Sequence, residues 1–213
     1  MNIYKILSVL LCYPEQELID SVPAIGQILS ELQVNNEYVQ PLLTELATND
    51  LITLQENYVQ TFDRTPTQSL HLFEHIHGED RIRGQAMVDL MQEYQNDGFE
   101  VTANELPDYL PLFLEYLAVC ETKKATELLG EAIDVIGHIE SKLSTNNSTY
   151  TGIFKQLISL SPTQPKPLIT PPIRDMDEAL EKFGPSSEGV EPLLQLNTSS
   201  ACITCESSAR QVK

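Results

Sequence analysis

The 213-residue chain contains no tryptophan, only 9 glycines and 4 cysteines, and no long hydrophobic run. None of its apolar stretches approaches the roughly 18 residues that a membrane-spanning helix needs. The first residues carry only Lys5 as a positive charge, and Pro14 interrupts them, which is not the pattern of a secretory signal peptide. We therefore expect a cytoplasmic protein without direct membrane insertion.

Basic residues are scarce, because 13 Lys and Arg stand against 31 Asp and Glu, for a net charge of −18. Residues 161–213 hold 5 of the basic and 7 of the acidic residues, so residues 1–160 carry a charge of −16. A negatively charged surface repels nucleic acid and anionic lipid, so we expect no nucleic-acid partner. It suits a basic partner such as an Arg-containing peptide, although an acidic surface also serves solubility alone.

Several sequence patterns of enzymes and of sheets are missing as well. The chain has no phosphate-binding glycine loop, no G-x-S-x-G, no dinucleotide fingerprint and no basic-aromatic stripe. No stretch alternates apolar and polar residues over the length of a strand. Cys12 and Cys120 stand in apolar helical contexts, as small buried residues do. Cys202 and Cys205 form one C-I-T-C, which without a second pair or a nearby His is a weak signal for zinc or redox chemistry.

The chain has helical periodicity almost throughout its first 160 residues. Apolar residues recur at helical spacing in stretches bounded by turn and capping signals. These stretches are residues 3–11, 18–32, 37–46, 51–62, 79–96, 107–119, 123–143 and 150–160, with Thr65–Pro66–Thr67 as a non-helical connection. The pattern predicts an all-α fold, a single-domain helical bundle of about seven to nine helices. Residues 161–213 are rich in Pro and Ser and predict a flexible, largely disordered tail, with a possible short helix at 175–183.

The helix at 107–119 is apolar on nearly all sides, which predicts a central, mostly buried helix. A capping pattern, T-A-N-E at 102–105, precedes it, and Pro107 suits the first helical position. On one interpretation this is only a well-capped core helix. On the other, Asp108 and Tyr109 lie exposed at its N-terminal end, where they can bind an Arg-rich peptide.

Residues 72–90 gather histidines, acids, arginines and glycines in one short segment. Together with His71 they contain His71-x-x-Glu74-His75, which formally matches a zinc-peptidase motif with two ligands at i and i+4 and a Glu as general base. The segment follows a Pro-containing loop and ends at Gly78, which is unfavourable for a regular helix. Hydrogen-bonded histidines are therefore favoured over a small zinc metallopeptidase, which is kept as the alternative function.

A second interpretation of this segment is a charged corner. Arg side chains can bind carboxylates in a bidentate manner and so fix a long loop against neighbouring helices. The corner's members are Asp63, Arg64, Glu74, Glu79, Asp80, Arg81 and Arg83. The network has either a purely structural role or a role in binding.

Three stretches read Y-x-x-T-F-D-R at 58–64, S-L-x-L-F-E-H-x-H-G-E-x-R-x-R-G-Q-A-M-V-D-L at 69–90, and E-L-P-D-x-L-P-L-F-L-E-Y-L at 105–117. In order and spacing they resemble the respiratory nitrate reductase assembly chaperones, the delta-subunit family within the redox enzyme maturation proteins. The resemblance extends over residues 1–160. The wider group commonly reads P-D-H where this chain has Pro107–Asp108–Tyr109.

The resemblance implies a private cytoplasmic chaperone that is not an enzyme and binds no cofactor stably. Such chaperones bind the N-terminal peptide of the nitrate reductase catalytic (alpha) subunit. They hold the apo alpha–beta complex while bis-molybdopterin guanine dinucleotide is inserted and before membrane attachment, and are not part of the final enzyme. Molybdenum cofactor biosynthesis proteins are further possible partners.

On this basis we expect a peptide-binding groove between the helices at 79–96 and 105–119, with an apolar floor and an acidic rim. The residues expected to bind the peptide are Asp63, Arg64, Phe73, Glu74, His75, Arg83, Asp108, Tyr109, Leu112 and Tyr116. No catalytic or metal-binding residue is expected. An acidic interaction module unrelated to nitrate respiration is a third possibility.

Overall fold

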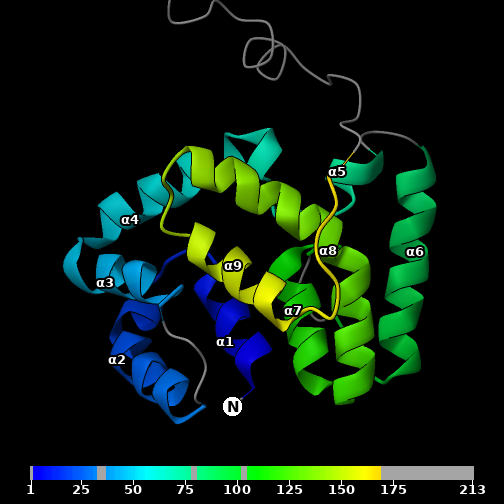
Figure 1. Ribbon diagram of the computed structural model, residues 1–213, viewed down its shortest axis with the longest axis horizontal. Helices are drawn as coiled ribbons and strands as arrows, with labels where there is room; N and C mark the ends of the chain where they lie inside the picture. Colours follow the sequence, from blue (N-terminus) through cyan, green and yellow to red (C-terminus); the bar gives the residue numbers. More distant parts are fainter. Residues whose placement is uncertain (1, 33–36, 78–80, 102–104, 169–213) are drawn as a thin grey trace, which may run out of the picture. The chain divides into compact units, whose positions relative to one another are not determined.

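The computed structural model describes residues 2–32, 37–77, 81–101 and 105–168 (Figure 1). By its contacts the chain divides into residues 1–172 and residues 173–213. The short helix expected at 175–183 and the C-I-T-C sequence lie outside the described residues. No helix in the described ranges is both long and apolar enough to cross a membrane.

Within those ranges the chain forms nine α-helices and two short irregular helices, and the predicted all-α fold is confirmed. The only extended pairing among these residues is one isolated bridge between His71 and Tyr109. The elements are α1 (Ile3–Leu10), α2 (Gln16–Glu31), α3 (Gln40–Thr48), α4 (Leu51–Tyr58), the π-helix η1 (Val59–Asp63), the 3-10 helix η2 (Pro66–Gln68), α5 (Glu74–His77), α6 (Arg81–Asn96), α7 (Leu110–Val119), α8 (Thr122–Thr145) and α9 (Thr151–Leu160).

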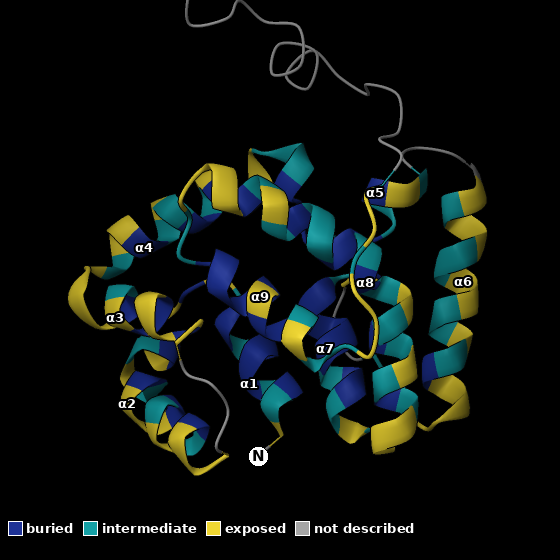
Figure 2. Cartoon of the chain, in the orientation of Figure 1, coloured by how far each residue is buried: buried dark blue, intermediate teal, exposed yellow. Residues whose placement is uncertain are grey.

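The core is built around α7, as its composition predicts. Its side chains Leu110, Leu114, Tyr116 and Leu117 are completely buried. Helix α1 packs along α7, and the Ser8 hydroxyl donates a hydrogen bond to the Pro111 carbonyl at 2.8 Å. Figure 2 shows the buried residues concentrated on α1, α7 and α9, with exposed residues on the outer helices. Each buried leucine contributes about 1.5–3 kcal/mol through removal of its apolar surface from water.

The start of α7 differs from the sequence prediction. The helix begins at Leu110 rather than Pro107, and Pro111 occupies its first turn. The reason is a tertiary pairing, because the Leu72 amide donates to the Asp108 carbonyl at 3.0 Å and the Leu110 amide donates to the Leu70 carbonyl at 2.8 Å. Backbone groups that a helix would need are thus bonded to another segment. The central part of the predicted cap, residues 102–104, lies outside the described residues.

Two other predicted boundaries are also shifted. The stretch 51–62 ends its α-helical part at Tyr58 and continues as η1 to Asp63. The connection expected to be non-helical contains η2, in which Pro66 stands at the start. Proline fixes φ near −65°, which suits the first residue of a helical turn.

The Pro-rich sequence after α9 packs on α8 over residues 161–168. The Lys166 amide donates to Asp134 Oδ1 on α8 at 2.7 Å. Gly137 of α8 has no side chain to obstruct Pro165, and Gly130 lies in the same way beside Pro162. The change of composition at residue 160 therefore precedes the end of the packed chain.

Candidate functional site

A groove opens between the end of α1, the start of α2 and the start of α7. Its volume is about 550 Å³. It is lined by Val9, Cys12, Tyr13, Glu15, Glu17, Leu18, Ser21, Glu105, Tyr109, Pro111, Leu112 and Glu115. We call it the acidic groove, since four carboxylates and no basic residue are among these residues.

The acidic groove combines an apolar floor with a charged rim. Leu18, Leu112 and the half-buried Tyr109 form apolar parts of its wall, while Glu15 and Glu105 are exposed. Glu115 is the one rim carboxylate with a basic partner in the described part of the chain, Lys5, whose Nζ lies 2.6 Å from its Oε1. The groove is therefore suited to an amphipathic ligand that carries positive charge.

Hydrogen bonds fix the tyrosines of the groove. The Tyr58 hydroxyl donates to the Leu11 carbonyl at 2.9 Å and lies 3.3 Å from the Tyr109 hydroxyl. Since the single Tyr58 proton is directed at Leu11, Tyr109 is the donor to Tyr58. Burial raises the pKa of Tyr109 to about 12, so the hydroxyl is neutral at physiological pH.

The cysteine in the groove is unreactive at neutral pH. Burial, with a further contribution from the Glu115 charge, raises the pKa of the Cys12 thiol to about 11. The thiolate is the nucleophilic form, so Cys12 is a poor nucleophile. Its Sγ is bonded to the Ser8 carbonyl at 3.4 Å. Cys12 therefore gives the groove no thiolate nucleophile at neutral pH.

Asp108 is completely buried, which corrects the prediction that it is exposed at the helix end. Its Oδ2 accepts a hydrogen bond from the Phe73 amide at 3.1 Å, and its Oδ1 lies 3.4 Å from His71 Nδ1. Arg83 Nη2 lies 3.9 Å from Oδ2 and donates to Glu74 Oε1 at 3.1 Å. We call Asp108, His71, Arg83 and Glu74 the Asp108 cluster. The pairing of residues 70–72 with 108–110 covers the carboxylate.

The Asp108 cluster positions Tyr109 at the acidic groove. The bridge between His71 and Tyr109 and the flanking backbone hydrogen bonds hold residues 70–72 against residues 108–110, directly beside the Asp108 side chain. The hydrogen bond with Asp108 raises the pKa of His71, although burial acts in the opposite direction. Protonated His71 therefore strengthens the pairing that orients Tyr109.

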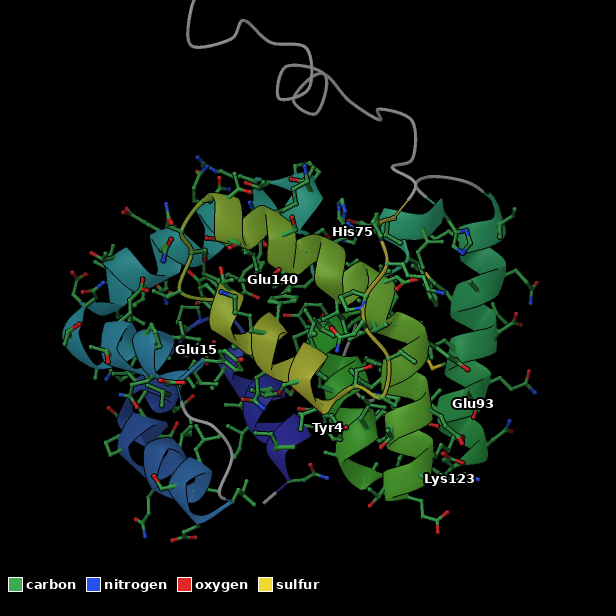
Figure 3. The ribbon with its side chains drawn as sticks, in the orientation of Figure 1. Tyr4, Glu15, His75, Glu93, Lys123 and Glu140 are labelled. Carbon is green, nitrogen blue, oxygen red and sulfur yellow. The ribbon has the colours of Figure 1, made fainter. Side chains whose placement is uncertain are left out.

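The zinc-peptidase motif does not form a ligand pair. His71 precedes α5 and faces Asp108, whereas the buried His75 lies within α5 and its Nε2 is 2.8 Å from the Ser69 carbonyl. In the parts of the chain described, no cluster of three His, Cys, Asp or Glu side chains has the arrangement to hold a metal ion. Figure 3 shows His75 and Glu15 well apart, so His75 is not a wall of the acidic groove.

The predicted charged corner is divided in the structure. Glu74 and Arg83 join Asp108, whereas Asp63 and Arg64 are exposed at the end of η1. The Asp63 charge contributes to the raised pKa of Tyr109. Glu79, Asp80 and the Arg81 side chain lie outside the described part of the chain.

The remaining expected residues have different surroundings. Phe73 is half-buried, with its ring centroid 6.1 Å from that of His77, and Leu112 lines the acidic groove. Tyr116 is completely buried, and its hydroxyl donates to Asp97 Oδ2 at 2.7 Å. Burial therefore prevents Tyr116 from contacting a ligand in this conformation.

Tyr94 in the last turn of α6 contacts α7 and the segment before it, within the region where the groove was expected. The ring centroids of Tyr94 and Tyr116 are 4.5 Å apart, and the Tyr94 hydroxyl donates to the Pro107 carbonyl at 2.7 Å. The acidic groove instead lies where α7 meets α1 and α2. Tyr13, Glu15 and Glu17 were not foreseen, although an exposed tyrosine among acids after the first helix is a visible signal.

In its described part the chain is thus a helical bundle with an acidic groove that has an apolar floor. The family described as nitrate reductase delta subunit matches residues 29–155. The nitrate reductase molybdenum cofactor assembly chaperone NarJ of Escherichia coli (strain K12) is 37% identical over 165 residues, covering 74% of this chain and 69% of NarJ.

Two further relatives agree. The probable nitrate reductase molybdenum cofactor assembly chaperone NarW of the same strain is 35% identical over 162 residues, covering 76% of this chain and 68% of NarW. The probable nitrate reductase molybdenum cofactor assembly chaperone NarJ of Bacillus subtilis (strain 168) is 31% identical over 159 residues, covering 73% of this chain and 86% of that protein. The chain therefore belongs to the nitrate reductase delta subunit family. The predicted resemblance is confirmed, and so is the prediction that the chain is not an enzyme, since the named relatives are assembly chaperones.

Proposed function

We propose that this chain is an assembly chaperone for a nitrate reductase and that its acidic groove binds the N-terminal peptide of the apo catalytic (alpha) subunit. The family and the names of the relatives support the chaperone role. The observation that carries the peptide assignment is the acidic groove itself, with four carboxylates around an apolar floor and no basic lining residue.

The expected mode of recognition is an amphipathic helix laid in a groove. Its apolar side chains contact Leu18, Leu112 and Tyr109, which removes apolar surface from water. Its Lys or Arg side chains pair with Glu15 and Glu105, which are exposed and have no basic partner in the described ranges. A hollow of about 550 Å³ holds several anchoring side chains of a short segment.

The proposal places the chaperone in the cytoplasm before the reductase is complete. It holds the apo alpha–beta complex while bis-molybdopterin guanine dinucleotide is inserted and until the complex attaches to its membrane subunit. The chaperone itself keeps no cofactor and leaves the finished enzyme. Proteins of molybdenum cofactor biosynthesis are proposed as further partners.

Calorimetry with the synthetic N-terminal peptide of the alpha subunit from the same organism tests the groove. We expect the Glu15→Gln/Glu105→Gln variant to bind the peptide about tenfold more weakly, because two exposed charge pairs are lost. The matched control is Glu31→Gln/Glu131→Gln, which removes the same charge from exposed positions on α2 and α8 outside the groove. The control is expected to bind like the unmodified chain.

The outcomes separate the alternatives. Equal losses in both variants would assign the effect to net charge and reject the groove. Unchanged affinity in the groove variant, with intact helicity, would also reject it. If the unmodified full chain captures neither the peptide nor the apo alpha subunit from nitrate-grown cells, the chaperone proposal fails and an unrelated acidic interaction module is favoured.

A further inference from the structure

A second hollow lies beside the acidic groove, on the other side of Tyr13. Its volume is about 710 Å³, and α4 and η1 form most of its wall. Tyr13 lines both hollows. The charged residues in the second lining are Glu56 and Arg64, so its charge is balanced where the acidic groove is strongly negative. Ile52 adds an exposed apolar side chain to the wall.

Contacts on the α4 side hold Tyr13 between the two hollows. The exposed Tyr13 ring packs edge-on against the buried Tyr58 ring, with centroids 5.5 Å apart. The Gln55 side-chain amide donates to the Pro14 carbonyl at 2.9 Å and ties the loop to α4. Tyr58 in turn is bonded to the Leu11 carbonyl. The loop after α1 is therefore fixed, and the two hollows are neighbouring parts of one surface.

Arg64 is positioned to receive a carboxylate. Its side chain is exposed, and it has no ion pair within the ranges that the structure describes. A guanidinium group offers five N–H donors in a planar arrangement that matches a carboxylate. A uniformly basic peptide would be repelled by it, whereas a peptide with an acidic residue beyond its basic segment would be held.

We infer that the two hollows form one extended peptide site, and that the bound peptide crosses Tyr13. One part of the site is strongly acidic, and the other is balanced in charge and contains Arg64. The basic, amphipathic segment lies in the acidic groove, and a following or preceding segment with an acidic side chain lies in the second hollow, paired with Arg64 and in contact with Ile52. This inference rests on the proposed function of the acidic groove. It adds the requirement that the peptide carry an acidic side chain next to its basic segment.

The inference is tested by whether a substitution at Arg64 weakens or strengthens peptide binding. In calorimetry with the alpha-subunit N-terminal peptide and the full chain, we expect Arg64→Gln to weaken binding by roughly threefold, and Arg64→Glu to weaken it further. If no acidic side chain meets Arg64, removing a positive charge beside the acidic groove would instead strengthen binding of a basic peptide. Strengthened or unchanged binding would overturn the two-part site.

Controls separate this inference from the proposed function. Lys123→Gln removes an exposed positive charge on α8, outside both hollows, and is expected to change the affinity little. A peptide with its Asp and Glu replaced by Asn and Gln should bind Arg64→Gln at least as tightly as it binds the unmodified chain, because Arg64 then has no carboxylate to pair with. If Glu15→Gln/Glu105→Gln weakens binding while Arg64→Gln does not, the acidic groove stands and the extended site fails. If neither variant weakens binding, both proposals fail.

Tyr13 provides a further measurement. We expect Tyr13→Ala to weaken binding by roughly tenfold, since the peptide loses an aromatic contact at its crossing point, and Tyr13→Phe to keep most of the affinity. Circular dichroism establishes that both variants are folded. Full affinity in a folded Tyr13→Ala variant would show that the peptide does not cross this residue.

Discussion

The buried carboxylate of Asp108 accepts a hydrogen bond from the Phe73 amide at 3.1 Å, across 35 positions of the sequence. Removing it leaves the Phe73 amide without its acceptor and takes one of two carboxylates from Arg83, which keeps Glu74. We therefore expect Asp108→Ala to lower the free energy of unfolding by about 3 kcal/mol. Urea denaturation followed at 222 nm measures this. Asp89→Ala, on the exposed side of α6, should stay within about 0.5 kcal/mol of the unmodified chain, and a similar small effect at Asp108 would contradict the cluster.

His71 makes the stability depend on pH. Its pKa is raised by the hydrogen bond to Asp108, so the folded state binds the proton more tightly than the unfolded state. The stabilisation is complete below the ordinary pKa of about 6.5 and is lost as pH rises through the folded value. The difference in unfolding free energy between the unmodified chain and His71→Gln should therefore shrink between pH 5.5 and 8.5. A difference that does not change with pH would contradict this assignment.

His138 should have the opposite pH dependence. Burial lowers its pKa, so the unfolded state binds the proton more tightly. Relative to His138→Gln, the unmodified chain should lose stability as pH falls below about 6.5. The same denaturation series measures it. Parallel behaviour of the two histidine variants would show that the pH dependence has another source.

Gly152 of α9 lies against the backbone of Tyr38, where an added Cβ would overlap the Tyr38 carbonyl. Because backbone cannot move aside as a flexible side chain does, Gly152→Ala should cost about 2–3 kcal/mol. Gly26→Ala on α2 is the matched control, since no heavy atom lies within 4 Å of its Cβ position. It should instead stabilise the chain by up to about 1 kcal/mol. Thermal and urea unfolding of both variants give the comparison.

The segment 161–168 is predicted to detach from α8 when Gly137 is replaced. An added Cβ in Gly137→Ala would overlap Pro165, so the segment must move and the Lys166 amide loses its bond to Asp134. We expect faster hydrogen exchange at the Lys166 amide, as in Asp134→Ala. Gly26→Ala should leave that exchange rate unchanged. If the Lys166 amide in Gly137→Ala exchanges as slowly as in the unmodified chain, the packing of residues 161–168 on α8 does not depend on the glycine.

Much of the fold follows from local pattern. Helical periodicity is set by neighbouring residues, so the helices were predictable within a few positions, and the uniform apolarity of 107–119 predicted the burial of α7. The family was also contained in the sequence, through the stretches at 58–64, 69–90 and 105–117. The acidic lining of the groove agrees with the composition of residues 1–160.

The sequence by itself thus determined the fold class, the family and the negative charge of residues 1–160. Tertiary structure alone decided that Asp108 is buried while Tyr109 reaches the groove, because a pairing between residues 70–72 and 108–110 settles both. It also decided where the groove opens, since the walls come from α1, α2 and α7 and only packing brings them together. Periodicity reports which face of a helix is buried, whereas a groove depends on where two packed helices fail to fill the space between them.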